Sequence, residues 1–366
     1  MIFNNLIIIS KIGYTLMVDT TTFFENIHTL TDFEDRAFGS VVGAFIGDSI
    51  GSFTEFRSIV PEEIAEQALT MPGGGPFNVS PGQVTDDSEL ALSLARGIVD
   101  GLICGRQDSI HEMIARRYGG WLASHPFDKG RTTYMALCTL LEKSQTEEGW
   151  AAECIHNSKK YNAPSESNGG LMRATPLAVY CATIDDENEV IHMARTEQSL
   201  THSNKTAQDA GISYVLALRH LIRERGDIRG AFGATERFAN EQGGGILTYL
   251  DQLSRPLLPG NERIGWAKIA WSYAFECLIR QMSFLDSMKF VLRQAGDTDT
   301  NCAIVGGMIG ASLGIKKMCE EIPSQIEIFK SCKVDETSCT NRRPQMFSPS
   351  NIIGLISVIL RNKRTY

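Results

Sequence analysis

The sequence lacks the patterns that mark several common classes of protein. Its nine cysteines form no Cys-x-x-Cys pair and no spacing with histidine typical of a zinc site. An odd number of scattered cysteines favours reduced thiols, so we expect a cytoplasmic protein. The longest apolar run, 352–360, is far short of the about twenty residues that a membrane span needs. No basic residue precedes the apolar residues 6–9, as an export signal would require.

An excess of basic residues is also missing. The net charge of -8 argues against general nucleic-acid binding, which needs a basic face. The end of the chain is an exception, because its basic residues have no acidic neighbours there: Arg342, Arg343, Arg361, Lys363 and Arg364. We interpret them as a solvated basic end, and the alternative is a site for an anionic partner. No convincing strand alternation occurs anywhere in the sequence, which favours an all-α fold.

Two short segments rich in carboxylates and hydroxyls each precede a helical pattern. The first contains Thr85, Asp86 and Asp87, and the second contains Asp297, Asp299 and Thr300. Thr300 is a favoured N-cap residue, which predicts that the second helix begins there. Oxygen ligands at this density suit a hard cation such as Mg²⁺, Mn²⁺ or Ca²⁺, and adjacent carboxylates repel one another without one. The simpler alternative is two acidic helix caps, since the helix dipole favours carboxylates at N-termini.

Glycines recur at every fourth position in two of the predicted helices. One set lies in the helical pattern 34–50 and just after it, and the other follows the second acidic segment: Gly39, Gly43, Gly47 and Gly51, then Gly306, Gly310 and Gly314. Each glycine costs about 1 kcal/mol relative to alanine in a helix, so a compensating contact is expected. The spacing predicts that these two helices touch. The alternative is that the glycines make room for a ligand.

Five segments in one order give the sequence a resemblance to a known family. They are 43–51 with Glu55, 85–87, 167–173, 201–202 and 296–300. Together they resemble the ADP-ribosylglycohydrolase family, the relatives of the dinitrogenase reductase-activating glycohydrolase. The resemblance and the helical patterns predict an all-α fold, a single large orthogonal helical bundle with a dinuclear metal cleft formed by loops at helix N-termini. We expect a family-like domain at 33–366, preceded by an N-terminal extension at 1–32.

The extension has three interpretations, because it lies outside the family resemblance. It is a disordered tail, a strap on the domain's own surface, or an arm that docks on a partner. Phe23 and Phe24 argue against full disorder, since disordered segments are poor in aromatic residues. Met17 is an alternative start, in which case residues 1–16 are not translated.

The resemblance implies a hydrolase that removes ADP-ribose from modified protein side chains. Arginine is the expected acceptor, with serine or another ADP-ribose as alternatives. Two Mg²⁺ ions are implied as cofactors, and Mn²⁺ shares their ligands. The metal ligands would be Thr85, Asp86, Asp87, Asp297, Asp299 and Thr300. Glu55, Asp87 and Asp299 would be catalytic, with Glu55 as the general base. Glycosidic cleavage builds positive charge on the sugar, which negative groups nearby stabilise.

The resemblance also implies a binding segment for the rest of ADP-ribose. A glycine turn that leads into a helix presents free N–H groups to a phosphate. The diphosphate or distal ribose would therefore lie against Ser167, Asn168, Gly169, Gly170 and His202. Two of the neighbouring residues have open roles: Arg173 either contacts the ligand or pairs with a carboxylate, and His202 is either a ligand contact or structural. Asp48 would be buried in its helix, so it needs a partner and would brace the site.

The expected partner is an ADP-ribosylated protein, and we expect a monomer that binds neither nucleic acid nor membrane. A second hypothesis is an immunity protein that blocks an ADP-ribosyltransferase through the N-terminal extension, with or without hydrolase activity. A third is a relative without activity that serves a structural role. It ranks last because all six clustered ligands are present in the sequence.

Overall fold

The chain is described by a computed structural model that covers residues 20–105, 110–144, 147–336 and 339–362. Every regular element in these ranges is a helix, apart from two isolated β-bridges, so the all-α prediction is confirmed. The α-helices are α2 Thr20–Glu25, α3 Asp32–Gly51, α4 Glu62–Leu69, α5 Asp86–Ile103, α6 Ile110–Ala123, α7 Arg131–Leu137, α8 Trp150–Tyr161, α9 Thr175–Cys181, α10 Glu187–Ser199, α11 Lys205–Arg223, α12 Ile228–Gln242, α13 Leu247–Leu253, α14 Ala267–Ile279, α15 Phe284–Gln294, α16 Thr298–Leu313, α17 Ile315–Glu321, α18 Pro323–Ser331 and α19 Asn351–Arg361. Short 3₁₀ turns occupy Ile27–Thr29, Cys138–Glu142, Asn168–Gly170, Gly244–Ile246 and Gln345–Phe347.

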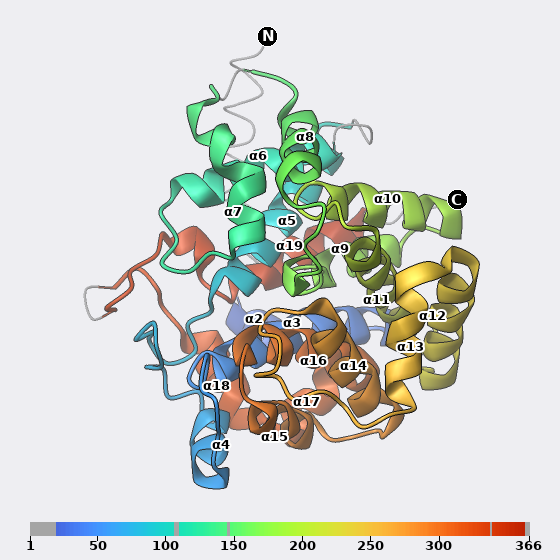
Figure 1. Cartoon of the computed structure of the whole chain (residues 1–366). Helices are drawn as coiled ribbons and strands as arrows, with labels where there is room; N and C mark the ends of the chain where they lie inside the picture. Colours follow the sequence, from blue (N-terminus) through green and yellow to red (C-terminus); the bar gives the residue numbers. More distant parts are fainter. Residues whose placement is uncertain (1–19, 106–109, 145–146, 337–338, 363–366) are drawn as a thin grey trace.

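Helices α3 and α16 run side by side through the middle of the molecule, and the other helices surround them (Figure 1). They are antiparallel, because Gly39 near the start of α3 faces Gly310, whereas Gly51 at its end faces Thr298. A Cβ at Gly43 would clash with the carbonyl oxygen of Gly306. The prediction that the two glycine-rich helices touch is therefore confirmed. The missing side chains allow backbone to pack on backbone, which offsets the poor helix propensity of glycine.

The start of α3 is fixed by its own sequence. The Thr31 hydroxyl accepts the Glu34 amide at 3.3 Å, and the Glu34 carboxylate accepts the Thr31 amide at 2.9 Å. This reciprocal cap satisfies two amides that have no partner inside the helix. From residue 37 onward every residue of α3 is buried, so the helix is enclosed on all sides. Such a helix can deliver a polar side chain only to a neighbouring element or to an internal site.

Two predicted helix starts differ from the structure. The second acidic segment does not begin its helix at Thr300, because α16 starts at Thr298 with Asp297 as the N-cap. The Thr298 hydroxyl donates to the Gly51 carbonyl at 2.7 Å, which ties the first turn of α16 to the end of α3. The glycine turn at 167–170 also does not open a long helix. It forms a 3₁₀ turn, and α9 begins only at Thr175.

The described part of the N-terminal extension packs on the rest of the chain. Phe23 in α2 is buried, and its ring centroid lies 4.5 Å from that of Phe38 in α3. Residues 1–19, and with them the alternative start at Met17, lie outside the described residues. Among the described helices, none is by itself long and apolar enough to cross a membrane. The bent pair of α16 and α17 together has the length and apolar composition of a span, and this rests on length and composition alone.

The close contact between α3 and α16 predicts opposite effects for two glycine-to-alanine changes. Gly43→Ala places a methyl group against the Gly306 backbone, so we expect it to lower the free energy of unfolding by about 1–3 kcal/mol or more. Gly120→Ala on the exposed side of α6 is the matched control, because no described atom lies within 4 Å of the new Cβ. It should raise stability by about 0.5–1 kcal/mol through helix propensity. Urea unfolding measures both, and equal effects would contradict the packing.

Candidate active site

The antiparallel contact brings the loop after α3 against the loop before α16. The Phe56 amide donates to the Gly296 carbonyl at 2.8 Å, and the Gly296 amide donates to the Arg57 carbonyl at 3.0 Å. The Thr54 hydroxyl donates to the Thr298 hydroxyl at 3.0 Å. These bonds hold the backbone on both sides of Glu55. They place its carboxyl beside Asp299 in the first turn of α16, although the two residues are far apart in the sequence.

Asp48 joins a third segment to this pair. Its carboxylate lies on the last turns of α3 and accepts hydrogen bonds from the Thr85 amide at 3.1 Å and the Ser88 amide at 3.1 Å. The hydroxyls of the same two residues donate to it at 2.9 and 2.6 Å. The N-cap residue Thr85 does not cap α5 with its own side chain. A buried carboxylate from another helix does so instead, which fixes Asp86 and Asp87 relative to α3.

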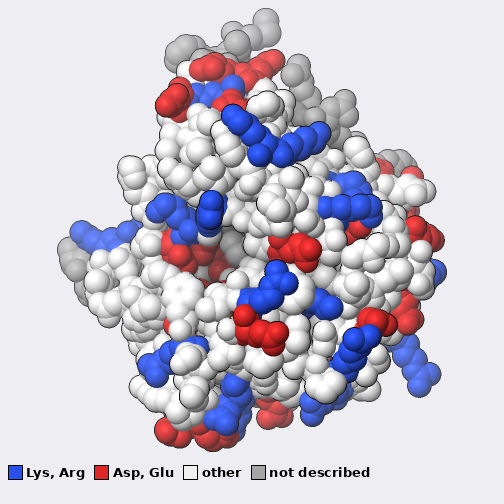
Figure 2. All heavy atoms as spheres, viewed as in Figure 1, with Lys and Arg blue, Asp and Glu red and all other residues white. Residues whose placement is uncertain are grey.

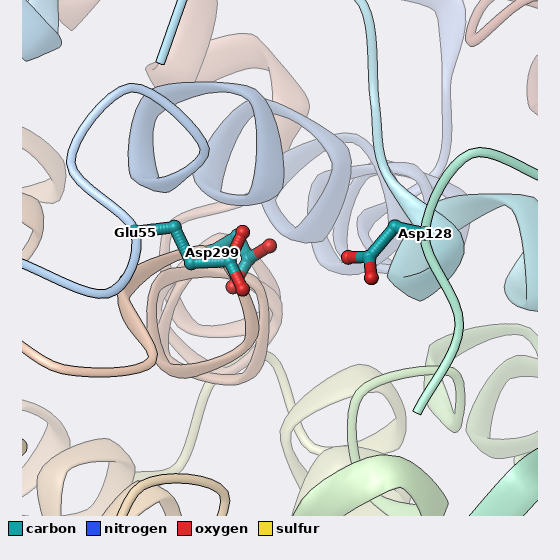
Figure 3. Close-up of side chains that lie close together, drawn as sticks. All are labelled: Glu55, Asp128 and Asp299. Carbon is teal, nitrogen blue, oxygen red and sulfur yellow. The ribbon is translucent and has the colours of Figure 1, made fainter. Parts of the chain in front are cut away.

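Asp128 completes the cluster, and sequence reasoning missed it. Oxygens of Glu55, Asp128 and Asp299 all lie within 4.8 Å of one another. Figure 3 shows Asp128, on the loop after α6, pointing toward Glu55 and Asp299 across the site. The Gly130 amide, two residues later, donates to Asp86 at 3.2 Å and so connects this loop with the start of α5. In Figure 2 acidic side chains gather at the bottom of a hollow, with basic side chains at its edge.

Burial and mutual repulsion dominate the electrostatics of these carboxylates, and the Lys129 charge offsets only part of the pKa shift at Asp128. Burial raises the pKa of Glu55 to about 9, and the charges of Asp128 and Asp297 add to the shift. Burial also raises the pKa of Asp87, with further contributions from Asp48 and Asp297, and it raises the pKa of Asp299, which lies near Glu55 and Asp87. The raised pKa of each group reports the free energy needed to hold its charge beside the others.

Two oxygens at the centre of the cluster have no hydrogen-bond donor. Among the described residues, nothing donates to Oδ1 of Asp87 or to Oε2 of Glu55, although both atoms are buried. A buried carboxylate oxygen normally has a partner, and a hard cation is the partner that several converging carboxylates prefer. The acidic cluster therefore fits a divalent cation. This cation would lower the pKa of its ligands and balance their charge.

The predicted metal ligands do not all lie in equivalent positions. Asp87 and Asp299 lie at the centre, and Asp86 lies between Gly130 and Asp128. The Asp297 carboxylate accepts the Asn168 side-chain amide at 2.8 Å, which leaves its other oxygen for the site. The Thr85 hydroxyl lies within hydrogen-bond distance of both Asp48 and Asp87. Thr300 is buried in the first turn of α16, and its amide donates to Asp299 at 2.7 Å.

The segment 167–170 lies beside the cluster, and several of its polar groups have partners within the protein. Asn168 binds Asp297, as described above, and its own amide donates to the Gly265 carbonyl at 2.9 Å. The Gly169 carbonyl accepts Arg173 at 3.0 Å, and the Gly170 carbonyl accepts Gln198 at 2.8 Å. Side chains at the two glycines would meet His202 and Gln198 respectively. The segment is thus a rigid wall that also positions Asp297.

His202 and Ser167 form part of a buried hydrogen-bond chain. Arg173 donates to the Thr201 hydroxyl at 2.6 Å, and that hydroxyl lies 2.7 Å from His202 Nδ1. Because the Thr201 hydroxyl proton has no other described acceptor, we assign it to Nδ1, so Nε2 carries the ring proton and donates to Ser167 Oγ at 2.9 Å. Burial, together with the Arg173 charge, lowers the pKa of His202 to about 3, so the ring is neutral.

Arg173 resolves one alternative left by the sequence. Its guanidinium donates to the Glu197 carboxylate at 2.8 Å, and both side chains are fully buried. The Tyr118 hydroxyl donates to the same carboxylate at 2.6 Å. Arg173 therefore pairs with a carboxylate and orients Thr201, and it does not face the acidic cluster. This ion pair fixes the helix α10 against the turn at 167–174.

The interpretation of the C-terminal arginines as a solvated basic end is wrong for Arg343. Its guanidinium is buried and donates to both oxygens of Glu89, at 2.8 and 2.9 Å. It also donates to the carbonyl and hydroxyl oxygens of Ser124, each at 2.7 Å. Glu89 lies in the first turn of α5, and Ser124 begins the loop that carries Asp128. Nothing local in the sequence marks this pairing, because Glu89 and Ser124 lie more than two hundred residues before Arg343.

Comparisons with known proteins identify the family of the chain. The ADP-ribosylglycohydrolase family model matches residues 29–335, so the chain belongs to this family of hydrolases. The ADP-ribosyl-[dinitrogen reductase] glycohydrolase of Rhodospirillum rubrum is 26% identical over 79% of this chain and 88% of its own. The ADP-ribosylarginine hydrolase Tri1 of Pseudomonas putida (strain GB-1) is 26% identical over 85% of this chain and 80% of its own. A solved structure titled ADP-ribosylglycohydrolase-related protein complex has the same fold, with a TM-score of 0.64, 22% identity, and coverage of 91% of this chain and 99% of its own.

The neutral, buried state of His202 predicts a pH-dependent contribution to stability. In the unfolded chain histidine takes up a proton near pH 6.5, whereas the folded ring does so only near pH 3. Stability is therefore present above pH 6.5 and is lost as the pH falls, by about 2 kcal/mol between pH 7 and 5. The stability difference between the wild type and His202→Gln should shrink by this amount over that range. A difference that stays constant with pH would contradict the buried, neutral assignment.

The buried pair of Arg343 and Glu89 predicts a large effect from a C-terminal substitution. Arg343→Met leaves the Glu89 charge buried with the Trp121 indole N–H as its one remaining side-chain donor among the described residues, so we expect a loss of about 3–5 kcal/mol in the free energy of unfolding. The matched control is Arg342→Met, because the neighbouring Arg342 is exposed, and it should change stability by less than about 0.5 kcal/mol. Chemical denaturation compares the two, and similar small losses would show that the ion pair is dispensable.

Proposed function

We propose that this chain hydrolyses the glycosidic bond between ADP-ribose and a modified arginine side chain, with divalent cations held by the acidic cluster. The observation that carries the proposal is the convergence of buried Glu55 and Asp299 with half-buried Asp128 on one point. Among the described residues, one carboxylate oxygen each of Asp87 and Glu55 is also buried without a partner. Mg²⁺ is the preferred ion and Mn²⁺ is the alternative, since both accept such ligands. Two ions would use the predicted ligands Thr85, Asp86, Asp87, Asp297, Asp299 and Thr300, with Asp128 added.

Each group of the site has a task in this reaction. Cleavage builds positive charge at the anomeric carbon, and the carboxylates stabilise this charge. The bound cations would supply a Lewis acid that orients ribose hydroxyls and water. Glu55 would accept the proton of the attacking water at its unpartnered Oε2, once a nearby positive charge has lowered its pKa. The Ser167 hydroxyl, which accepts from neutral His202 at 2.9 Å and donates to Thr132 at 3.0 Å, would help to hold the wall of the binding segment without adding charge.

The acceptor linkage is the finer part of the proposal. Two relatives carry names that state a linkage or a target, namely an ADP-ribosylarginine hydrolase and a dinitrogen reductase glycohydrolase. Their similarity supports arginine over serine as the acceptor. The alternative function, in which the N-terminal extension blocks an ADP-ribosyltransferase, has less support. In the described part of the extension, Phe23 is buried against Phe38 of the same chain, so its side chain is not exposed to a partner.

Release of ADP-ribose from defined linkages tests the proposal. With Mg²⁺, the wild type should release ADP-ribose from an arginine-modified protein, and excess chelator should stop the release. Asp87→Asn and Asp299→Asn should each lower kcat by about 100-fold or more. Asp251→Asn is the control, because this exposed carboxylate on α13 pairs only with Arg255 at 3.0 Å among the described residues.

Three outcomes would contradict parts of the proposal. Release only from serine-linked substrate would overturn the arginine linkage. Release that continues in excess chelator would overturn the requirement for a cation. Absence of release from arginine-, serine- and poly-ADP-ribosylated protein alike would overturn the hydrolase activity itself. Mg²⁺ should in addition raise the melting temperature of the wild type, since an ion that binds only the folded state stabilises it.

A further inference from the structure

Three phenylalanines form a connected group beside the acidic cluster. The ring centroids of Phe56 and Phe77 are 6.2 Å apart, and those of Phe77 and Phe127 are 5.6 Å apart. We call this group the aromatic rim. Phe56 directly follows Glu55, and Phe127 directly precedes Asp128. The rim therefore connects the loops that supply two of the three converging carboxylates.

Phe56 is held in an unusual conformation. Its φ is 61°, in the left-handed region that a bulky side chain rarely adopts. The hydrogen bonds of Phe56 and Arg57 with Gly296 maintain this backbone. Phe56 is nevertheless 54% exposed, so burial of its side chain does not offset the cost of the strained backbone. Strain that is maintained beside catalytic carboxylates and presents an apolar ring to solvent is typical of a ligand-binding position.

The place of the rim decides which part of the substrate it can meet. The anomeric carbon must lie at the carboxylates, and the acceptor side chain is bonded directly to that carbon. The adenine, in contrast, lies two riboses and a diphosphate away. We assign the aromatic rim, whose Phe56 and Phe127 adjoin Glu55 and Asp128 in the sequence, to the acceptor side. A guanidinium group is planar and cationic, so it stacks on phenyl rings and is attracted by the carboxylates beside them.

The same loop already contains a contact of this kind. The guanidinium of Arg57 lies 5.8 Å from the centroid of the Phe53 ring. From these observations we infer that the aromatic rim, with Phe77 at its centre, binds the guanidinium of the acceptor arginine and selects arginine-linked over serine-linked substrates. This inference rests on the proposed function, because it assigns the acceptor side of the same site.

Substitutions of Phe77 test the inference, because this ring contacts both others and is only half-buried. Phe77→Leu keeps an apolar side chain but removes the π face, and Phe77→Tyr keeps the face. Two substrates share one peptide sequence that contains both arginine and serine. ADP-ribose is attached to the arginine in one substrate and to the serine in the other. For the arginine-linked peptide we expect Phe77→Leu to raise KM about five- to tenfold with kcat within about twofold. Phe77→Tyr should keep the KM of the wild type, and any turnover of the serine-linked peptide should be unchanged in both variants.

Two results would overturn the inference. One is a wild-type KM for the arginine-linked peptide in Phe77→Leu. The other is an equal rise for both linkages, or a rise that Phe77→Tyr does not prevent, since either would mean that the ring only supports the loops. Melting temperatures identify a variant that is unfolded, and in that case Phe127→Leu and Phe127→Tyr provide the same comparison.

A binding measurement separates this inference from the proposed function. Agmatine carries a guanidinium but no ADP-ribose, so saturation-transfer NMR with agmatine needs no turnover. The wild type and Phe77→Tyr should give a signal that Phe77→Leu weakens several-fold. Binding of agmatine by an inactive wild type would overturn the hydrolase and keep the guanidinium site. If the arginine linkage is hydrolysed but Phe77→Leu changes neither agmatine binding nor KM, the proposed hydrolase activity stands. The guanidinium-binding role of the aromatic rim is then overturned.

Discussion

The close packing of α3 on α16 is the constraint on which the rest of the structure depends. Glycine at every fourth position lets the two backbones meet, and the antiparallel direction places the end of α3 against the start of α16. Three carboxylates depend directly on this contact. Asp48 lies on α3, Glu55 follows it, and Asp299 lies in the first turn of α16. Loss of the contact would therefore separate the groups of the site as well as open the core.

Around this pair, the other helices hold carboxylates together against their mutual repulsion. Asp48 caps α5 from outside, and Arg343 connects Glu89 on α5 with Ser124 at the start of the loop that carries Asp128. Burial raises the pKa values of the resulting cluster, to about 9 for Glu55 and about 6 for Asp48. Such an arrangement favours binding of a cation, because a bound cation would relieve the repulsion between the carboxylates and stabilise the fold.

The parts of the site that could be predicted from the sequence are those that depend on local sequence patterns. The glycine period predicted the contact of α3 and α16, and the two Thr/Asp segments predicted acidic helix starts that converge. Asp128 was missed because one aspartate in a loop has no period or repeated neighbour to mark it. The partner of Arg343 was missed for a different reason, since pairing across most of the chain depends on tertiary packing. The start of α16 was misplaced because both Asp297 and Thr300 are favoured caps, and the contact of Thr298 with Gly51 decides between them.

The central claim is that the packed helices hold a cation site at Glu55, Asp128 and Asp299. Crystals soaked in Mn²⁺ and measured at the manganese absorption edge test it most directly, since anomalous scattering locates the ion without reference to activity. The account predicts anomalous density between these three carboxylates, with Asp87 close by. Well-ordered crystals with occupied Mn²⁺ positions elsewhere and none at this cluster would contradict it.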